Sequence, residues 1–346
     1  MLLGLAEALP SLVEARFASA KAASSLLFSP TEVSTIRTSS GIPFQLRFCP
    51  TLAKKPTAKD NNNTPKKIID PFDNPSEALH VADIPSFNPS HVLVLNKFPI
   101  IPEHFILATK SNKRQTQVLE QDDLEATYAC LQAWQGGPSS KQKRLFAFFN
   151  SGEHSGASQP HRHVQFLPVE SMREGAATDS WDLLLDIILS GNSEGPSARL
   201  MQHDGLPFTH FARTFSSEPT GVELLSIYEE LHHAASESVD QYIATDPTGF
   251  ALHSTDGGDS PISYNLAMTT TGMVILPRRS EGTMLRRHDG SEIGFVALNG
   301  TTLGGTMMVK HVEEWDVLRK EPGMLDSILT AIGVPKQPRP SERSRV

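Results

Sequence analysis

Apolar residues recur at every second position in several stretches of the chain, and this alternation predicts β-strands. Residues 42–48 alternate in this way, and residues 144–150 and 161–169 form two apolar runs joined by a turn-rich loop. Residues 91–98 and 104–109 flank a short proline-containing connection, which is typical of an antiparallel hairpin. These runs predict a sheet in the first part of the chain.

Helical spacing of apolar residues marks other stretches. The clearest lies at residues 122–135, where an apolar stripe runs from Leu124 to Leu131. Asp122 with Glu125 resembles a capping box at its start. Further helices are predicted over residues 2–27, with Pro10 as an early break, and over residues 181–189, 222–235 and 324–332.

The second half of the chain repeats the hairpin pattern loosely, with strands predicted over residues 263–270, 272–277 and 305–310. Antiparallel hairpins mix with helices and no regular βαβ alternation is present, so we expect an α+β fold. The loose repeat favours a second half that is a diverged duplicate of the first. We divide the chain into an N-terminal half, residues 1–200, a C-terminal half, residues 205–335, and a disordered tail, residues 336–346.

Composition narrows the class of protein. Of the 346 residues, 38% are hydrophobic, which allows a sizeable core. The net charge of −8 opposes general binding to nucleic acids or anionic membranes. No apolar run approaches the length of a transmembrane helix. The two cysteines, Cys49 and Cys130, exclude a disulfide framework. We expect a reducing intracellular compartment, the cytoplasm with the nucleus as an alternative, and an N-terminal helix rather than a signal peptide.

The chemically informative segment runs from residue 150 to residue 168. Since side chains at alternate positions of a strand share a face, His161, His163 and Gln165 form one row. A loop rich in glycine and serine precedes this row, and small residues let backbone N–H groups approach an anion closely. The sequence therefore predicts an anion-binding loop that leads directly into a row of histidines.

A histidine in such a row can attack phosphorus as a nucleophile. One ring nitrogen must then be unprotonated, while a hydrogen bond to an acceptor holds the proton on the other. The amide of Gln165 can bond phosphoryl oxygens without titrating. This chemistry suits a polyphosphate or nucleotide leaving group, which needs little protonation.

Two other interpretations of the histidines stay open. A bare His-x-His pair is often only a pair of partly exposed histidines in a strand, with no catalytic role. A zinc site needs further ligands, and His104, His154, Cys49 and Cys130 are candidates without a supporting spacing. We treat His104 and His154 as structural residues.

The segment His161-Arg-His163-Val-Gln165 resembles the His-x-His-x-Gln signature of the galactose-1-phosphate uridylyltransferase branch of the histidine-triad superfamily. The longer string from Asn150, with the predicted hairpin and residues 263–278, is similar to fungal diadenosine tetraphosphate phosphorylases, also called ATP adenylyltransferases. The resemblance implies a histidine-triad-like antiparallel sheet flanked by helices.

The resemblance also implies a two-step transfer centred on His163. His163 would attack an α-phosphate of diadenosine tetraphosphate, ATP would leave, and phosphate would release ADP from the adenylylated histidine. Gln165 would contact the reacting phosphate, and His161 would orient the row or bond a neighbouring carbonyl. Substrate contacts are implied for Lys55, Asn96, Lys97, Asn150, Ser151, Gly152, Ser155, Gly156, Ala157, Ser158, Gln159, Asn265, Met273 and Arg278. The chain departs from the family at Thr270 and Gly272, where a lysine and a bulky aromatic residue are common, which affects the second nucleotide contact.

Rival functions share parts of this site. The same histidine would serve a dinucleoside polyphosphate hydrolase or a hexose-1-phosphate uridylyltransferase, and a catalytically idle nucleotide-binding protein would keep the loop. No P-loop motif is present, so a P-loop NTPase is disfavoured. We expect a monomer that binds small-molecule substrates and no nucleic acid or membrane. No organic cofactor is expected, and a divalent cation such as Mg²⁺ or Mn²⁺ would act through substrate phosphates.

Overall fold

The computed structural model describes residues 3–51, 70–136, 143–173, 181–191, 200–215, 218–246, 250–321 and 323–336. Among these residues, eight strands form one sheet in which every neighbouring pair is antiparallel. In sheet order they are β3 (His80–Ile84), β4 (His91–Leu95), β5 (Phe105–Thr109), β7 (His163–Pro168), β6 (Leu145–Ser151), β9 (Ser263–Thr269), β10 (Gly272–Arg278) and β8 (Phe211–Thr214). The α+β expectation and the predicted hairpin, now β4 and β5, are confirmed, and the sheet takes strands from both predicted halves.

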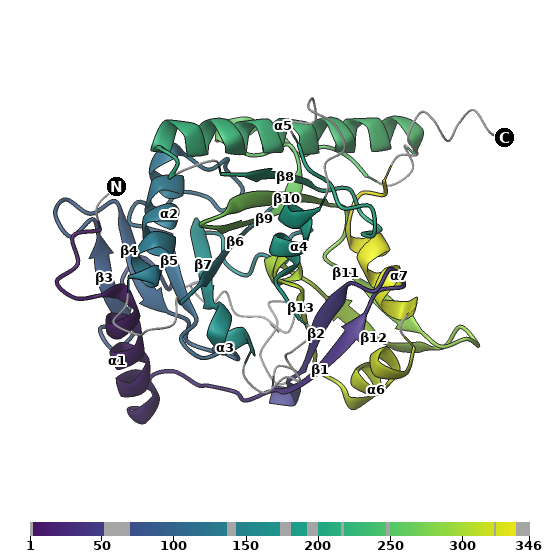
Figure 1. Ribbon diagram of the computed structural model, residues 1–346, viewed down its shortest axis with the longest axis horizontal. Helices are drawn as coiled ribbons and strands as arrows, with labels where there is room; N and C mark the ends of the chain where they lie inside the picture. Colours follow the sequence, from purple (N-terminus) through teal and green to yellow (C-terminus); the bar gives the residue numbers. More distant parts are fainter. Residues whose placement is uncertain are drawn as a thin grey trace, which may run out of the picture.

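Three helices cover one face of this sheet, as Figure 1 shows: α1 (Leu9–Ala22), α2 (Gln121–Gln135) and α5 (Gly221–Thr245). The predicted stripe of α2 is buried from Leu124 to Leu131. Helix α5 continues ten residues beyond its predicted end at residue 235, because Val239 extends its buried stripe. We call this side of the sheet the helix face.

The opposite face is covered at one end by a second layer. A small sheet is formed by β1 (Glu32–Arg37), β2 (Pro43–Phe48) and β13 (Thr306–Val309), with β2 and β13 parallel. Around it lie α3 (Val169–Arg173), α4 (Leu184–Ser190), η4 (Gly300–Gly304), α6 (Val312–Lys320) and α7 (Gly323–Ile332), with the hairpin of β11 (Gly282–Arg286) and β12 (Glu292–Ala297). A short turn of 3₁₀-helix, η3 (Asp256–Gly258), precedes β9.

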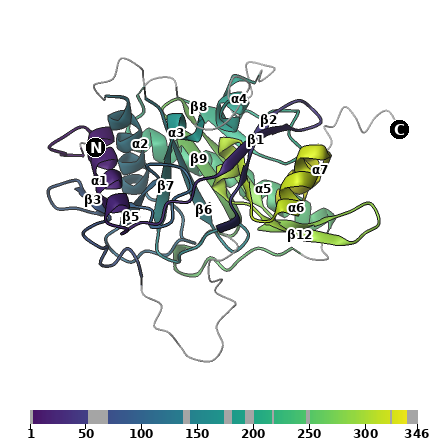
Figure 2. The ribbon, with the colours of Figure 1, turned by 90° about the horizontal axis from the view of Figure 1, so that it is seen from below.

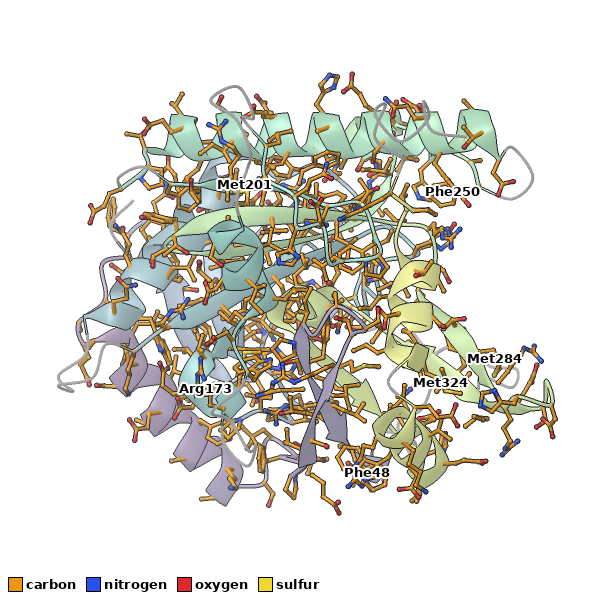
Figure 3. The ribbon with its side chains drawn as sticks, turned by 45° about the vertical axis from the view of Figure 1, so that its right-hand side comes forward. Phe48, Arg173, Met201, Phe250, Met284 and Met324 are labelled. Carbon is orange, nitrogen blue, oxygen red and sulfur yellow. The ribbon has the colours of Figure 1, made fainter. Side chains whose placement is uncertain are left out.

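The two ends of the molecule differ in how they are built. Figure 2 shows α1 and β3 at one end and α6, α7 and β12 at the other. At the second end, Phe48 stacks on Trp315 of α6 with ring centroids 5.8 Å apart. Met284 of β11 and Met324 of α7, labelled in Figure 3, line a surface hollow at the same end. The histidine row lies between these ends, on the large sheet.

Several predicted details are wrong. Pro10 lies in the first turn of α1, where its missing N–H costs no hydrogen bond, so it begins the helix instead of breaking it. The capping box of α2 uses Glu120 and Asp123 because the helix starts at Gln121. Val169 begins α3 and does not extend β7.

Candidate active site

Strand β7 carries the histidine row, and its side chains alternate between the two faces of the large sheet. Arg162 and Phe166 point to the helix face, where the guanidinium of Arg162 bonds a carboxylate of α2 and Phe166 enters the core. His161, His163 and Gln165 lie on the opposite face. The three side chains therefore share a face, as the alternation predicts.

His163 is held in one tautomer. Its Nδ1 donates to the carbonyl oxygen of His161 at 2.8 Å, so the lone pair is on Nε2. Within the described part of the chain, no group bonds Nε2. Burial lowers the pKa of His163 to about 4, although the hydrogen bond to the carbonyl of His161 opposes part of this shift. The ring is therefore neutral at neutral pH, the state that a nitrogen nucleophile requires.

Gln115 clamps the backbone beneath the row. Its Oε1 accepts from the N–H of His163 at 2.8 Å, and its Nε2 donates to the carbonyls of Asn150 at 2.8 Å and His163 at 3.2 Å. The side chain is buried. It bridges β6 and β7 just where the two strands separate around the glycine-rich loop. Sequence reasoning missed Gln115, because 48 residues separate it from His163.

His161 is bonded at both ring nitrogens. Its Nδ1 lies 2.7 Å from Oδ2 of Asp70, and its Nε2 lies 2.7 Å from the carbonyl oxygen of Thr109. The ring is almost fully buried. These contacts fix the backbone at His161, whose carbonyl oxygen accepts the hydrogen bond from His163. Asp70 is a second residue that the sequence analysis missed.

A directed chain of hydrogen bonds reaches Gln165 from the β4–β5 hairpin. Oδ1 of Asn96 accepts from the N–H of Phe98, so its Nδ2 faces Nδ1 of His104 at 3.2 Å. Nε2 of His104 then donates to Oε1 of Gln165 at 3.0 Å. Among the described residues, no group bonds the amide nitrogen of Gln165, which can therefore donate to an anion. His104, treated as structural from the sequence, therefore contacts the histidine row through Gln165.

The loop before the row offers backbone donors. Ala157 and Ser158 are exposed, and Gly156 and Gln159 are half-buried. In the described part of the chain, the backbone N–H groups of residues 156 to 159 have no hydrogen-bond acceptor. The hydroxyl of Ser155 instead bonds the carbonyl of Gly152 at 2.6 Å, which closes the turn. The loop therefore presents amide donors, the arrangement that binds anions.

A buried polar network holds this loop from behind. Nδ2 of Asn265 donates to Oδ1 of Asn150 and to the carbonyl of Ser155, both at 2.9 Å. The guanidinium of Arg278 bonds Oδ1 of Asn265 and the carbonyl of Leu298. Burial lowers the pKa of Arg278 to about 9. Asn150, Asn265 and Arg278 are fully enclosed, and their hydrogen bonds hold the loop in position. The substrate contacts implied for them stay predictions.

Two predicted contact residues lie on the wrong side of the sheet. Met273 pairs with Met268, and the same line of cross-strand pairs reaches Phe166. Met273 therefore lies on the helix face and is buried in the core beneath the helices. Ser151 is fully buried opposite Tyr264 on that same face. The structure does not bring either residue to the histidine row. The prediction missed this because a match by position does not show which face a side chain occupies.

Lys97 and the two departures from the family lie at different places in the structure. Lys97 is exposed beside Asn96, with its ammonium 5.8 Å from the ring centroid of Phe98. Lys55 lies outside the described residues. At Gly272, a Cβ would meet the carbonyl oxygen of Arg213 at 2.5 Å, so β8 leaves no room for an aromatic side chain there. The Thr270 hydroxyl accepts from Gln135 at 2.8 Å.

The described residues contain no cluster of three or more His, Cys, Asp or Glu side chains suited to a metal ion. No helix in the same residues has the length and apolar character needed to cross a membrane.

Comparison with protein families gives two adjoining matches. The Ap4A phosphorylase N-terminal domain matches residues 4–183, and the ATP adenylyltransferase C-terminal domain matches residues 204–335. Diadenosine 5',5'''-P1,P4-tetraphosphate phosphorylase 2 of Saccharomyces cerevisiae is 29% identical over 300 residues, 84% of each chain. Protein APA1 of the same yeast is 29% identical over 341 residues, 94% of each chain.

Solved structures share the fold. The crystal structure of yeast Ap4A phosphorylase Apa2 has a TM-score of 0.74 at 24% identity, covering 95% of this chain and 98% of that chain. Its complex with Ap4A has a TM-score of 0.75 at 24% identity, covering 98% and 100%.

Proposed function

Since these matches span most of its length, this chain belongs to the Ap4A phosphorylase family, and we propose that it cleaves diadenosine tetraphosphate (Ap4A) with inorganic phosphate to give ADP and ATP. The observation that carries the proposal is the state of His163. Its ring is neutral and its proton is held on Nδ1. Among the described residues, neither Nε2 nor the backbone N–H groups of residues 156–159 in the preceding loop have a hydrogen-bond partner.

The reaction divides into two displacements at phosphorus. Nε2 of His163 attacks the α-phosphorus, forming an N–P bond as the P–O bond to the leaving ATP breaks. An oxygen of inorganic phosphate then attacks the same phosphorus, the N–P bond breaks, and ADP leaves. We propose that the amide nitrogen of Gln165 and the N–H groups of residues 156–159 bond the phosphoryl oxygens as their charge grows.

The remaining site residues serve this geometry. Asn96 and His104 set the orientation of Gln165, while Gln115 and His161 set that of His163. Lys97 is proposed to attract the polyphosphate through its exposed charge. We expect a divalent cation to enter with the substrate phosphates, as a counter-ion to their charge.

A product analysis tests the proposal. Ap4A is incubated with the protein, with and without inorganic phosphate, and the nucleotides are separated by chromatography. Equal amounts of ADP and ATP that form only with phosphate support phosphorolysis. AMP and ATP regardless of phosphate would instead favour the hydrolase, and no turnover would favour the binding protein.

The covalent step has its own test. Ap4A labelled at the α-phosphate is mixed with the protein without phosphate, and the protein is denatured. We expect label on the wild type and none on His163→Ala. His288→Ala is the matched control, because the His288 side chain is 93% exposed. Retention of label by His163→Ala would place the nucleophile elsewhere.

A further inference from the structure

A short segment of the chain, residues 70–73, lies over the histidine row. We call it the cover segment. Oδ2 of Asp70 lies 2.7 Å from Nδ1 of His161 and accepts from Nδ2 of Asn112 at 3.0 Å. Oδ1 of Asp70 accepts from the N–H of Phe72 at 2.9 Å, which closes a turn. One carboxylate thus fastens this segment both to the row and to the loop after β5.

The turn places the ring of Phe72 directly against the proposed nucleophile. The ring centroid of Phe72 lies 5.1 Å from that of His163 and 5.6 Å from that of His161. Phe72 is 5% exposed and packs in an apolar cluster with Val92, Val94, Ile106 and Ala108. His163 itself is 3% exposed. On this side the reacting ring therefore faces hydrocarbon and not solvent.

The ring of His161, to which Asp70 is bonded, is itself held at its other nitrogen. The Thr109 hydroxyl donates to the carbonyl of Ser111 at 2.8 Å, so toward His161 it can only accept. Nε2 of His161 thus faces two acceptors on Thr109, while Nδ1 faces the carboxylate of Asp70. The carboxylate of Asp70 and the oxygens of Thr109 therefore hold the ring of His161 from both sides.

Hydrogen-bond donors for the molecule that accepts the adenylyl group are distributed unevenly around the histidine row. The loop of residues 156–159 presents backbone N–H groups that attract an anion. The Phe72 ring presents no group that can orient or deprotonate a water molecule. Exclusion of water protects reactive intermediates from hydrolysis. The adenylylated histidine is an intermediate that needs this protection, because water is far more abundant than phosphate and competes with it.

We propose that the cover segment selects the acceptor: Phe72, held by Asp70, keeps water from adenylylated His163 so that the adenylyl group passes to phosphate. This inference rests on the proposed function. In both fates the N–P bond to His163 breaks. Attack by a phosphate oxygen gives ADP, whereas attack by water gives AMP and releases a proton.

The test is the ratio of AMP to ADP formed from Ap4A at saturating phosphate. We expect wild type to form almost no AMP. Phe72→Ala should raise the AMP fraction at least tenfold, Asp70→Ala should raise it in the same direction, and Phe72→Leu should restore most of the wild-type ratio. Phe87→Ala is the matched control, because Phe87 is 89% exposed and outside the site. Without phosphate, the labelled protein intermediate should decay at least tenfold faster in Phe72→Ala.

Several outcomes overturn the proposal. One is a high AMP fraction in the wild type. Another is an unchanged fraction in Phe72→Ala with only a higher KM, which would make the ring a contact for the nucleoside. A third is the loss of intermediate formation in Phe72→Ala and Phe72→Leu alike, which would assign Phe72 to the first step. Failure of the proposed function is distinct, because wild type would then form no ADP and ATP with phosphate.

Discussion

His104 donates from Nε2 to Oε1 of Gln165 at 3.0 Å, across the pairing of β5 with β7. The direction of this bond follows from Asn96, whose amide nitrogen faces the other ring nitrogen of His104. An amide that is not fixed could turn its oxygen toward a phosphoryl group and repel it. His104 thus acts as a positioning residue through Gln165.

We expect His104→Leu to lower kcat by about 10- to 100-fold with little change in KM, since the lost contact serves the reacting phosphate. Gln165→Leu should lower kcat by at least as much. The double variant should be no more than about threefold slower than Gln165→Leu, because residues that act as a unit are not additive. Steady-state kinetics of the three variants measure this, and independent, multiplicative effects would contradict the relay.

The buried network behind the loop predicts a loss of stability in Arg278→Met. The substitution leaves Oδ1 of Asn265 and the carbonyls of Ser280, Glu281 and Leu298 without their donor. Relief of the buried charge offsets only part of this, so we expect a loss of about 3 kcal/mol in the free energy of unfolding. Urea denaturation measures it.

The control for this variant is a surface arginine. Arg286 is 54% exposed and pairs with Glu292 at 2.7 Å. Because exposed ion pairs contribute little, Arg286→Met should change the free energy of unfolding by less than about 1 kcal/mol. Equal losses in Arg278→Met and Arg286→Met would show that the buried network has no special role.

The sequence was informative where the signal is local. Alternation within one strand sufficed to place His161, His163 and Gln165 on one face, since adjacent residues define that pattern. The stripe of α2 followed in the same way from helical spacing. The elements β1, β11, β12 and α6 were not predicted, because each is short and few residues define its period.

The supporting residues could not be found this way, because sheet pairing and chain crossing bring them together. Asp70 reaches His161 across 91 positions, and Gln115 reaches His163 across 48. Their residue types are common on protein surfaces and give no signal alone. Met273 shows the converse error: its place in the chain matched, but the register of β9 and β10 turns it to the helices.

Gly156 offers a sharp test of the loop. Its φ is +76°, and an added Cβ would lie 2.6 Å from the carbonyl oxygen of Leu298. Gly290 has φ +84° but no atom within 4 Å of such a Cβ. Both alanine variants pay the cost of left-handed backbone, about 1 kcal/mol. Only Gly156→Ala must also displace the loop, so its KM for Ap4A should rise about tenfold or more while that of Gly290→Ala stays within about twofold. Equal KM values for Gly156→Ala and Gly290→Ala would show that the loop does not bind the substrate.

The depressed pKa of His163 predicts how the first step depends on pH. Burial holds this pKa at about 4, below its ordinary value of 6.5, and the groups that face the ring are His161 and Asp70. Because the neutral ring is the nucleophile, the rate stays high as pH falls through 6.5 and drops only as pH approaches 4. The measurement is the burst of ATP from Ap4A without phosphate, from pH 4.5 to 8, with circular dichroism at each pH to verify the fold. A half-maximal rate near pH 6.5 in folded protein would mean that His163 titrates as an exposed histidine, and the buried nucleophile would be wrong.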